Sequence, residues 1–243
     1  MNRSHEVYDA LVKWSDRLQA LPGWKEWNRA KISFTLSHDD GQRKPIDLPS
    51  IFPLPPEIDK QHAAMMAWLH LNATVRGMRA CSSYLRHAPN PRLGITTEDH
   101  LRYMVELYFS RVYEFSERLK KMMNALSDTI APAEFNTGTI IKDFKRVFKQ
   151  EIAQRNSTHH DEHFDDVSLD QLGLVNLIGQ TETGQLKGWK EEHQWLWRKA
   201  SKEWRGRIDR GADKAEIYVE SVAAAMIDYC PWLTDSVAEA ERR

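Results

Sequence analysis

The feature that most constrains the fold of this chain is a long amphipathic segment between residues 101 and 126. Its apolar residues recur at spacings of three and four, so they share one face of a helix with a period of 3.6. This stripe consists of Leu101, Met104, Val105, Tyr108, Val112, Phe115, Leu119, Met122, Met123 and Leu126. A helix of about seven turns with one apolar face must bury that face against other helices.

Helical spacing also predicts helices in residues 4–21, 57–87, 169–178 and 186–204, and a helix after Pro132 whose apolar face runs from Ile140 to Ile152. A last helix starts at Gly211-Ala212-Asp213 and ends at Pro231. Residues 24–36 fit either a helix or a strand at Ile32–Leu36. Residues 37–56 are irregular, because their prolines forbid a regular helix. No alternating strand pairs occur, so the sequence predicts an all-α fold.

We interpret residues 1–56 as an extension of N-terminal helices followed by a proline-rich arm, and residues 57–243 as a bundle of long antiparallel helices. The arm contains the apolar residues Ile51, Phe52 and Leu54, which are expected to be buried against the rest of the chain. His193 lies on a tryptophan-rich helical stripe and is predicted to be a core histidine, whereas Trp195 lies on the opposite side.

The charge balance excludes a strong overall attraction to nucleic acid. The chain has 34 Lys and Arg against 35 Asp and Glu, so any such surface must be a local patch. No apolar run reaches the ~18 residues of a transmembrane helix, and the first twenty residues do not resemble a signal peptide. Cys81 and Cys230 lie far apart without a CxxC spacing, which predicts reduced thiols in a cytoplasmic protein that has no membrane partner.

The polar run at residues 155–163 contains the residues of this chain that are best suited to bind phosphate and to exchange protons. It holds an arginine, an amide, three histidines and two carboxylates: Arg155, Asn156, His159, His160, Asp161, Glu162 and His163. An arginine grips phosphate through a planar fork, and a histidine exchanges protons near neutral pH. On an unbroken helix, however, residues 155 and 160 lie ~140° apart. A joint site therefore needs a break just after Asn156 or one residue from each of two chains.

Two other interpretations of this run stay open. It can be a solvated helix end, where histidines near the C-terminus interact favourably with the helix dipole. Alternatively, His159 and His163 have the i, i+4 spacing of metal ligands, with Asp161 and Glu162 close by. The pair has no defined third ligand, so we assign no metal to it.

The sequence Arg155-Asn156-x3-His160, at the end of an amphipathic helix in an all-α chain, resembles the Arg-x(4–6)-His motif of the HEPN superfamily. The resemblance covers about residues 96–230. It implies a HEPN-like helical bundle and a two-fold homodimer, with Arg155, Asn156 and His160 of both chains meeting in a cleft. Many HEPN domains are metal-independent ribonucleases, so the resemblance predicts an endoribonuclease without a cofactor.

In that interpretation His160 is the general acid or base for a ribose 2′-OH, and Arg155 stabilises charge developing on phosphate. Asn156 positions the phosphate or orients His160. Some HEPN domains only bind nucleotides or pair with another protein, such as an antitoxin. A non-catalytic interaction module is therefore the alternative.

A basic strip formed by Lys142, Lys145 and Lys149 precedes the motif, with Arg146 beside it. Lys145 and Lys149 stack at i and i+4, which suits contact with an RNA backbone. The strip can equally be the polar side of an amphipathic helix. We predict RNA binding by these lysines, assisted by His159 and His163.

Overall fold

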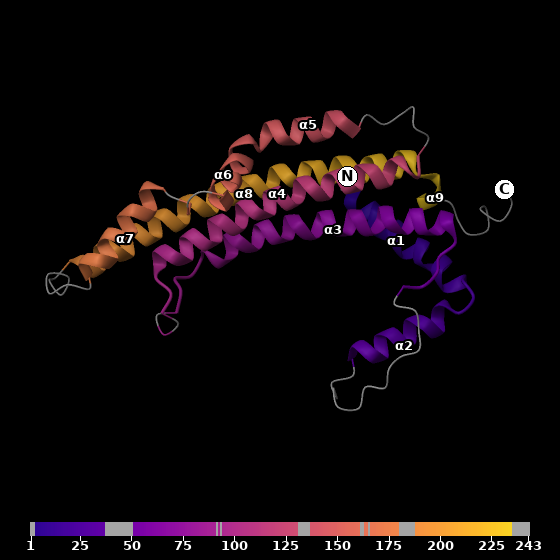
Figure 1. Cartoon of the computed structure of the whole chain (residues 1–243), viewed down its shortest axis with the longest axis horizontal. Coiled ribbons are helices and arrows are strands. Elements are labelled where there is room, and N and C mark those ends of the chain that lie inside the picture. The colour runs from indigo at the N-terminus through magenta and orange to yellow at the C-terminus, as the bar shows by residue number, and fades with distance from the viewer. Residues whose placement is uncertain are drawn as a thin grey trace. The chain divides into compact units, whose positions relative to one another are not determined.

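The computed structural model describes residues 3–36, 51–90, 92, 94–130, 137–160, 163–164, 166–179 and 188–234, with side chains left out at 137 and 158–160. Within these ranges all regular structure is helical, which confirms the all-α prediction (Figure 1). The helices are α1 (Arg3–Ala20), α2 (Trp24–Leu36), α3 (Pro56–Tyr84), α4 (Thr97–Ser127), α5 (Thr137–Val147), α6 (Lys149–His160), α7 (Val167–Gly179), α8 (Trp189–Tyr229) and α9 (Pro231–Thr234).

The chain divides into two compact units. The first comprises Met1–Met66, Ala125–Pro132 and Glu220–Arg243, and the second comprises Ala67–Asn124 and Ala133–Val219. Helices α3, α4 and α8 each contribute residues to both units. The division at residue 56 that the sequence suggests coincides with the start of α3 and stays a prediction.

The first unit is held by contacts between α1 and the start of α3. The Trp14 indole donates a hydrogen bond of 2.8 Å to the Gln61 side chain, and both residues are buried. Residues 32–36 belong to helix α2, so the structure decides between the helix and the strand. Residues 37–50 of the arm lie outside the described residues.

In the described part of the arm, after residue 50, the half-buried Phe52 ring packs on Trp24 and Trp27, at centroid distances of 5.1 and 5.7 Å. Ile51, in contrast, is 78% exposed, so it does not bury as predicted.

In the second unit, α4 begins at a capping motif. The Thr96 hydroxyl accepts a hydrogen bond of 3.0 Å from the Asp99 backbone N–H, and it donates one of 2.8 Å to the Asp99 carboxylate. This reciprocal pair satisfies a backbone donor that a helix start otherwise leaves free. The predicted stripe then forms the core of α4, with Leu101, Val105, Val112, Phe115 and Leu119 all at 0% exposure.

Helices α3 and α4 are antiparallel, as the sequence predicts for neighbouring long helices. The Arg118 guanidinium on α4 donates to the His70 carbonyl on α3 at 2.7 Å, and it also pairs with Glu114 at 2.5 Å. At the other end of the pair, the His100 ring lies 3.2 Å from the Tyr84 carbonyl.

Helices α4 and α8, in contrast, run in the same direction. Thr97 on α4 meets His193 on α8 at 2.8 Å, and further along both helices Phe109 contacts Trp204. The sequence does not predict this parallel pair, because an apolar stripe shows which face of a helix is buried but not the direction of the helix that packs against it.

One predicted boundary is wrong. The sequence places a helix start at Gly211, whereas α8 runs without a break from Trp189 to Tyr229. A Cβ atom at Gly211 would lie 2.9 Å from Cζ of Tyr108 and even closer to its hydroxyl. Gly211 is therefore a site of close packing inside a helix, a role that glycine fills because it lacks a side chain. Leu186, predicted to begin this stripe, lies outside the described residues.

Neither cysteine forms a disulfide. Cys81 and Cys230 are buried free thiols, and burial raises the pKa of each to about 11. Within the described residues no helix combines the length and apolar character that crossing a bilayer requires.

Candidate functional site

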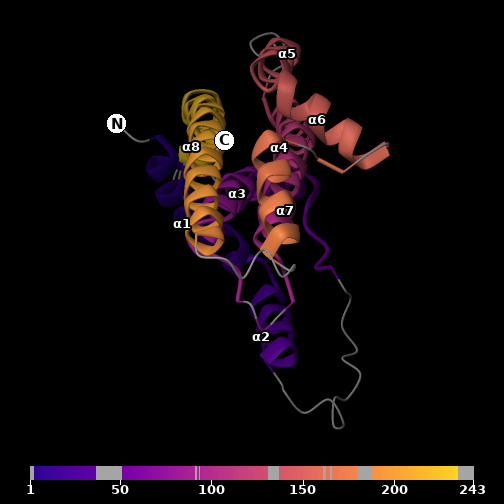
Figure 2. The same ribbon diagram turned by 90° about the vertical axis from the view of Figure 1, so that its left-hand side faces the viewer.

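The Arg155 motif lies on its own short helix at the surface of the second unit. Helix α5 ends at Val147 and α6 begins at Lys149, and the chain changes direction between them (Figures 1 and 2). Phe148, at the junction, is 1% exposed and stacks on Phe144 at 4.5 Å. Phe144 in turn stacks on Phe115 of α4 at 5.0 Å. These rings anchor the start of α6, while no side chain described on α6 itself is buried.

Arg155 is held in place by an aromatic ring. Its guanidinium carbon lies 4.1 Å from the centroid of Tyr113 on α4, a cation–π geometry. Its Nη1 atom also donates to the amide oxygen of Asn156 at 3.3 Å. Among the described residues no carboxylate forms an ion pair with Arg155. The half-exposed guanidinium is therefore oriented by neutral groups, and its charge is not neutralised by them.

Arg155 and His160 lie on different sides of helix α6. The helix continues without a break through His160, so the break after Asn156 that a joint site in one chain requires is absent. At 100° per residue the two positions are ~140° apart around the helix. The side chains of His159 and His160 lie outside the described residues. A site that joins the two residue types therefore needs a second chain.

His163, just beyond α6, is placed against α4. Its Nδ1 atom lies 3.6 Å from Oε1 of Glu106, and its side chain is 83% exposed. The same carboxylate oxygen accepts a hydrogen bond of 3.1 Å from the backbone N–H of Phe164. Glu106 therefore fixes the chain that leaves α6, and His163 is an exposed neighbour of this contact.

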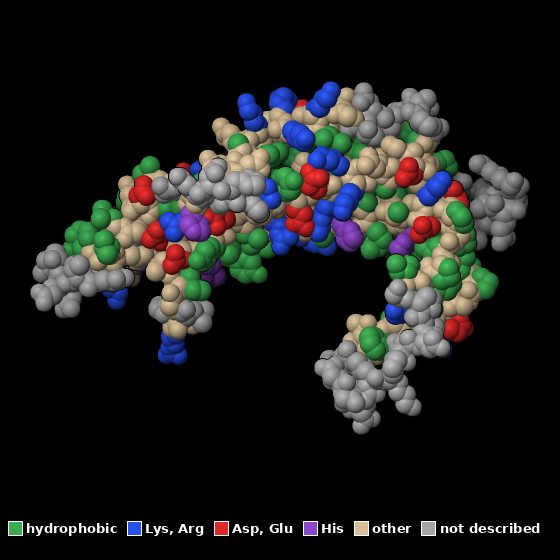
Figure 3. Space-filling view, viewed as in Figure 1, with side chains coloured by type: hydrophobic (Ala, Val, Ile, Leu, Met, Phe, Trp, Pro, Cys, Tyr) green, Lys and Arg blue, Asp and Glu red, His purple; other side chains and the backbone are tan. Residues whose placement is uncertain are grey.

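The structure brings the predicted basic strip to the surface. Lys142, Lys145 and Lys149 are all exposed, and no described residue forms an ion pair with them. Figure 3 shows Lys and Arg side chains along the outer side of α5. Arg146 is bound at 2.5 Å to Asp143, which also accepts a hydrogen bond of 2.6 Å from Tyr218. The hydrogen bonds from Tyr218 and from Arg146 lower the pKa of Asp143, so this carboxylate stays charged within the strip.

The metal alternative gains no support from the described residues. Among them, no group of three or more His, Cys, Asp or Glu side chains is arranged to hold a metal ion. His159, Asp161 and Glu162 lie outside that search, so the His159 and His163 pair stays a hypothesis from spacing alone.

Sequence reasoning missed the residues that position this site. By sequence alone Tyr113 lies at the flank of the α4 stripe and Glu106 on the polar side of the helix. Both contact the segment after α5, more than forty positions away in the chain. No local pattern could have shown these pairings, because they depend on which face of α4 the later segment covers.

Comparisons with known proteins leave the family open. No protein-family model, no curated protein and no solved structure matches the chain. The HEPN resemblance therefore rests on the motif and on the all-helical context described above.

Proposed function

We propose that this chain is a metal-independent endoribonuclease of the HEPN type, with its active site built from two chains. The observation that carries the proposal is the state of Arg155. Its guanidinium is held on the Tyr113 ring and has no ion pair with a described carboxylate. A charged arginine kept in place by neutral groups is ready to bind a phosphate.

The separation of Arg155 and His160 around α6 leads to a dimer. A single chain presents the two residues on different sides of the helix, and a two-fold axis near α6 lets Arg155 of one chain face His160 of the other. Homodimers with such two-fold symmetry are the commonest soluble oligomers. The proposed site therefore occurs twice in each dimer.

The residue types define the chemistry of RNA cleavage. One His160 takes the proton of a ribose 2′-OH while the 2′ oxygen attacks phosphorus, and the bond to the 5′ oxygen breaks. The leaving 5′ oxygen takes its proton from water, so each site needs one Arg155 and one His160 from different chains. Arg155 stabilises the charge on the phosphate oxygens, and Asn156 positions the phosphate. The products are a 2′,3′-cyclic phosphate and a 5′-OH.

Exposed lysines give the RNA a path to this site. Lys142, Lys145 and Lys149 lie on α5 and at the start of α6, ahead of Arg155 on the same run of chain. Their exposure and lack of described ion-pair partners suit contact with successive phosphates.

The test uses the variants Arg155→Ala and His160→Ala, each as a homodimer and also as a mixed dimer in which each chain carries one of the two substitutions. Each variant alone should lose ~10² to 10⁴ in cleavage rate, which is typical of removing one acid–base or electrostatic group. Co-expression of the two variants should restore about a quarter of the wild-type rate, because half of the dimers are mixed and each mixed dimer keeps one intact site. The rate is measured on a labelled RNA, with melting temperature as the check on folding.

Matched controls come from the neighbouring histidines. His159→Ala and His163→Ala should reduce cleavage much less than His160→Ala, because the motif gives them no catalytic role. A co-expressed pair that stays as inactive as its parents would overturn the two-chain site. Cleavage that survives His160→Ala would overturn the assignment of the acid–base group.

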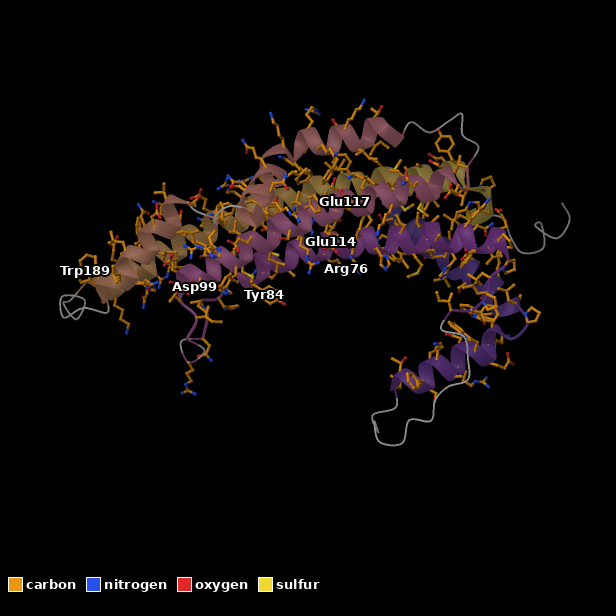
Figure 4. The ribbon with its side chains drawn as sticks, viewed as in Figure 1. Arg76, Tyr84, Asp99, Glu114, Glu117 and Trp189 are labelled. Atoms are coloured by element: carbon orange, nitrogen blue, oxygen red, sulfur yellow. The ribbon has the colours of Figure 1, made fainter. Side chains whose placement is uncertain are left out.

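A second candidate function follows from a different surface. Helix α7 buries Leu169, Leu172 and Val175 on one side and exposes Val167, Leu174 and Leu177 on the other. Beside it, a groove of about 580 Å³ is lined by Leu174, Trp195 and also Trp189, which Figure 4 labels at the start of α8. An apolar surface of this kind suits a protein partner. A wild-type chain that binds RNA or protein but cleaves nothing would favour this interaction module.

A further inference from the structure

A second candidate site lies one turn before Arg155 on α6, in a cavity of about 350 Å³ between α4, α6 and α8. Three aromatic rings form part of its lining and pack edge to face. Phe164 lies 5.3 Å from Phe109 and 5.3 Å from Trp204, measured between ring centroids. The volume is at the lower end of the range for small-molecule sites, so the cavity suits one planar group rather than a large ligand.

Glu151 is the polar group in this cavity that lacks a counter-charge. It is half-buried on α6, and no described residue forms an ion pair with it. The nearby cation is engaged elsewhere, because the Arg207 guanidinium lies 4.0 Å from the Trp204 ring centroid and 3.9 Å from Asp166. A partly buried carboxylate without a cation favours a ligand that brings N–H donors.

Two further polar groups line the cavity. The Trp204 indole N–H is buried and has no hydrogen-bond partner within 3.5 Å among the described residues, and the buried Tyr108 hydroxyl interacts with the Glu151 carboxylate. Burial, together with the charge of Glu151, raises the pKa of Tyr108, so its hydroxyl stays protonated. Unpaired buried polar groups cost free energy, and a bound polar ligand lowers that cost.

The cavity lies one helical turn from Arg155. Glu151 and Arg155 are four residues apart on α6, so their Cβ atoms are ~5–6 Å from each other. A phosphate bound by Arg155 would therefore leave the base of the same or the adjacent nucleotide within reach of Glu151. This geometry connects the cavity to the proposed cleavage site.

We propose that this cavity binds a guanine base, with the Glu151 carboxylate accepting hydrogen bonds from the N1–H and N2–H groups. The inference rests on the proposed function and adds a base preference to it. Guanine presents two adjacent donors on its Watson–Crick edge, which match the two oxygens of a carboxylate. Adenine, cytosine and uracil each place an acceptor beside a donor, and a carboxylate repels that acceptor.

Arg207 gives the base a surface to stack on. One face of its guanidinium covers Trp204, while its side chain keeps 45% exposure. Unstacked bases commonly pack on arginine planes and aromatic rings in RNA complexes. The same chemistry would accept a free guanine nucleotide, so the experiment must separate RNA from nucleotide.

The test measures binding by fluorescence anisotropy on 2′-O-methylated oligouridine with one central guanine, adenine, cytosine or inosine. The 2′-O-methyl group blocks cleavage, so binding is measured by itself. Wild-type protein should prefer guanine over uracil by roughly tenfold, a typical gain from a two-point contact to a base edge. Inosine lacks the N2 amino group, so it should fall between the two. This comparison changes the ligand and leaves the protein intact.

The protein-side variant is Glu151→Gln, which keeps the shape and removes the charge. It should abolish the guanine preference and leave binding of plain oligouridine unchanged. Glu203→Gln, at an exposed glutamate outside the cavity, is the matched control and should keep the preference. Equal binding of all four oligonucleotides by the wild-type protein, or a guanine preference that survives Glu151→Gln, would overturn the inference.

Guanosine 5′-monophosphate separates the two sources of guanine. Binding of the free nucleotide at an affinity equal to that of the guanine oligonucleotide, lost in Glu151→Gln, supports the base site and identifies a nucleotide ligand. Guanine-selective binding without cleavage supports the base site and contradicts the proposed ribonuclease. Cleavage without any base preference contradicts the base site alone.

Discussion

Helices α4 and α6 touch each other in the same compact unit, yet they are held in opposite ways. The apolar stripe of α4 is fully buried, with Val112, Phe115 and Leu119 at 0% exposure. No side chain described on α6 is buried, and its Arg155 rests on the ring of Tyr113 from α4. One helix is fixed by its own packing, and the other is fixed by its neighbours at its two ends.

This difference separates stability from function. Changes on α4 act on the fold, because each buried residue fills space that nothing else can occupy. Changes on α6 remove chemical groups from the surface and leave little empty space behind. The comparison therefore predicts that variants of the two helices will fall into distinct classes when stability and activity are measured together.

The largest expected effect is the loss of stability in Phe115→Ala. The ring is fully buried and stacks on Phe144 at the anchor of α5 and α6. Its removal should lower the free energy of unfolding by ~3–5 kcal/mol. Tyr103→Ala, at a 52% exposed position on the same helix, and Asn156→Ala on α6 should each stay within about 0.5 kcal/mol of wild type.

Chemical denaturation followed by circular dichroism measures all three variants. A drop for Asn156→Ala as large as that for Phe115→Ala would contradict the comparison, because it would show that α6 is part of the stabilising core.

The sequence predicts α4 well because a strong apolar stripe decides which face is buried and Thr96 marks where the helix starts. It also locates the motif residues, since their types carry chemical information without any structure. It does not show that Tyr113 holds Arg155, or that Glu151, Phe164 and Trp204 share a cavity. Such contacts join residues far apart in the sequence, and periodicity has no information about partners.

The second expected effect is the destabilisation caused by Gly211→Ala. A methyl group there would collide with the buried Tyr108 side chain, whose Cζ would lie 2.9 Å away. Alanine is the better helix former by ~1 kcal/mol, so propensity alone predicts a gain. Overpacking should outweigh it and lower stability by ~1–3 kcal/mol.

Tyr108→Phe in the same chain provides the control for this clash, because it removes the hydroxyl that lies nearest to the new methyl group. The double variant should recover part of the lost stability in a thermal melt. A single variant Gly211→Ala that melts above wild type would show that α4 and α8 are packed less tightly here than the structure indicates.

The smallest expected effect concerns pH and the contact between α4 and α8 at His193. Burial lowers the pKa of this histidine, whose Nε2 atom lies 2.8 Å from the Thr97 hydroxyl. The unfolded chain therefore binds a proton at His193 more readily than the folded chain does. The contribution of the neutral histidine to stability is complete above the unfolded pKa of ~6.5, and it is lost as the pH falls through the lowered folded pKa.

His193→Gln cannot be protonated, so its stability should fall less than that of wild type between about pH 7.5 and about pH 5.5. Thr97→Ala removes the hydrogen bond but leaves the imidazole half-buried, and should lower stability by ~0.5–1.5 kcal/mol while keeping the pH dependence. Thermal melts across this pH range measure both variants. A pH dependence that is unchanged in His193→Gln would show that other groups cause it, and one lost in Thr97→Ala would assign it to the hydrogen bond rather than to burial.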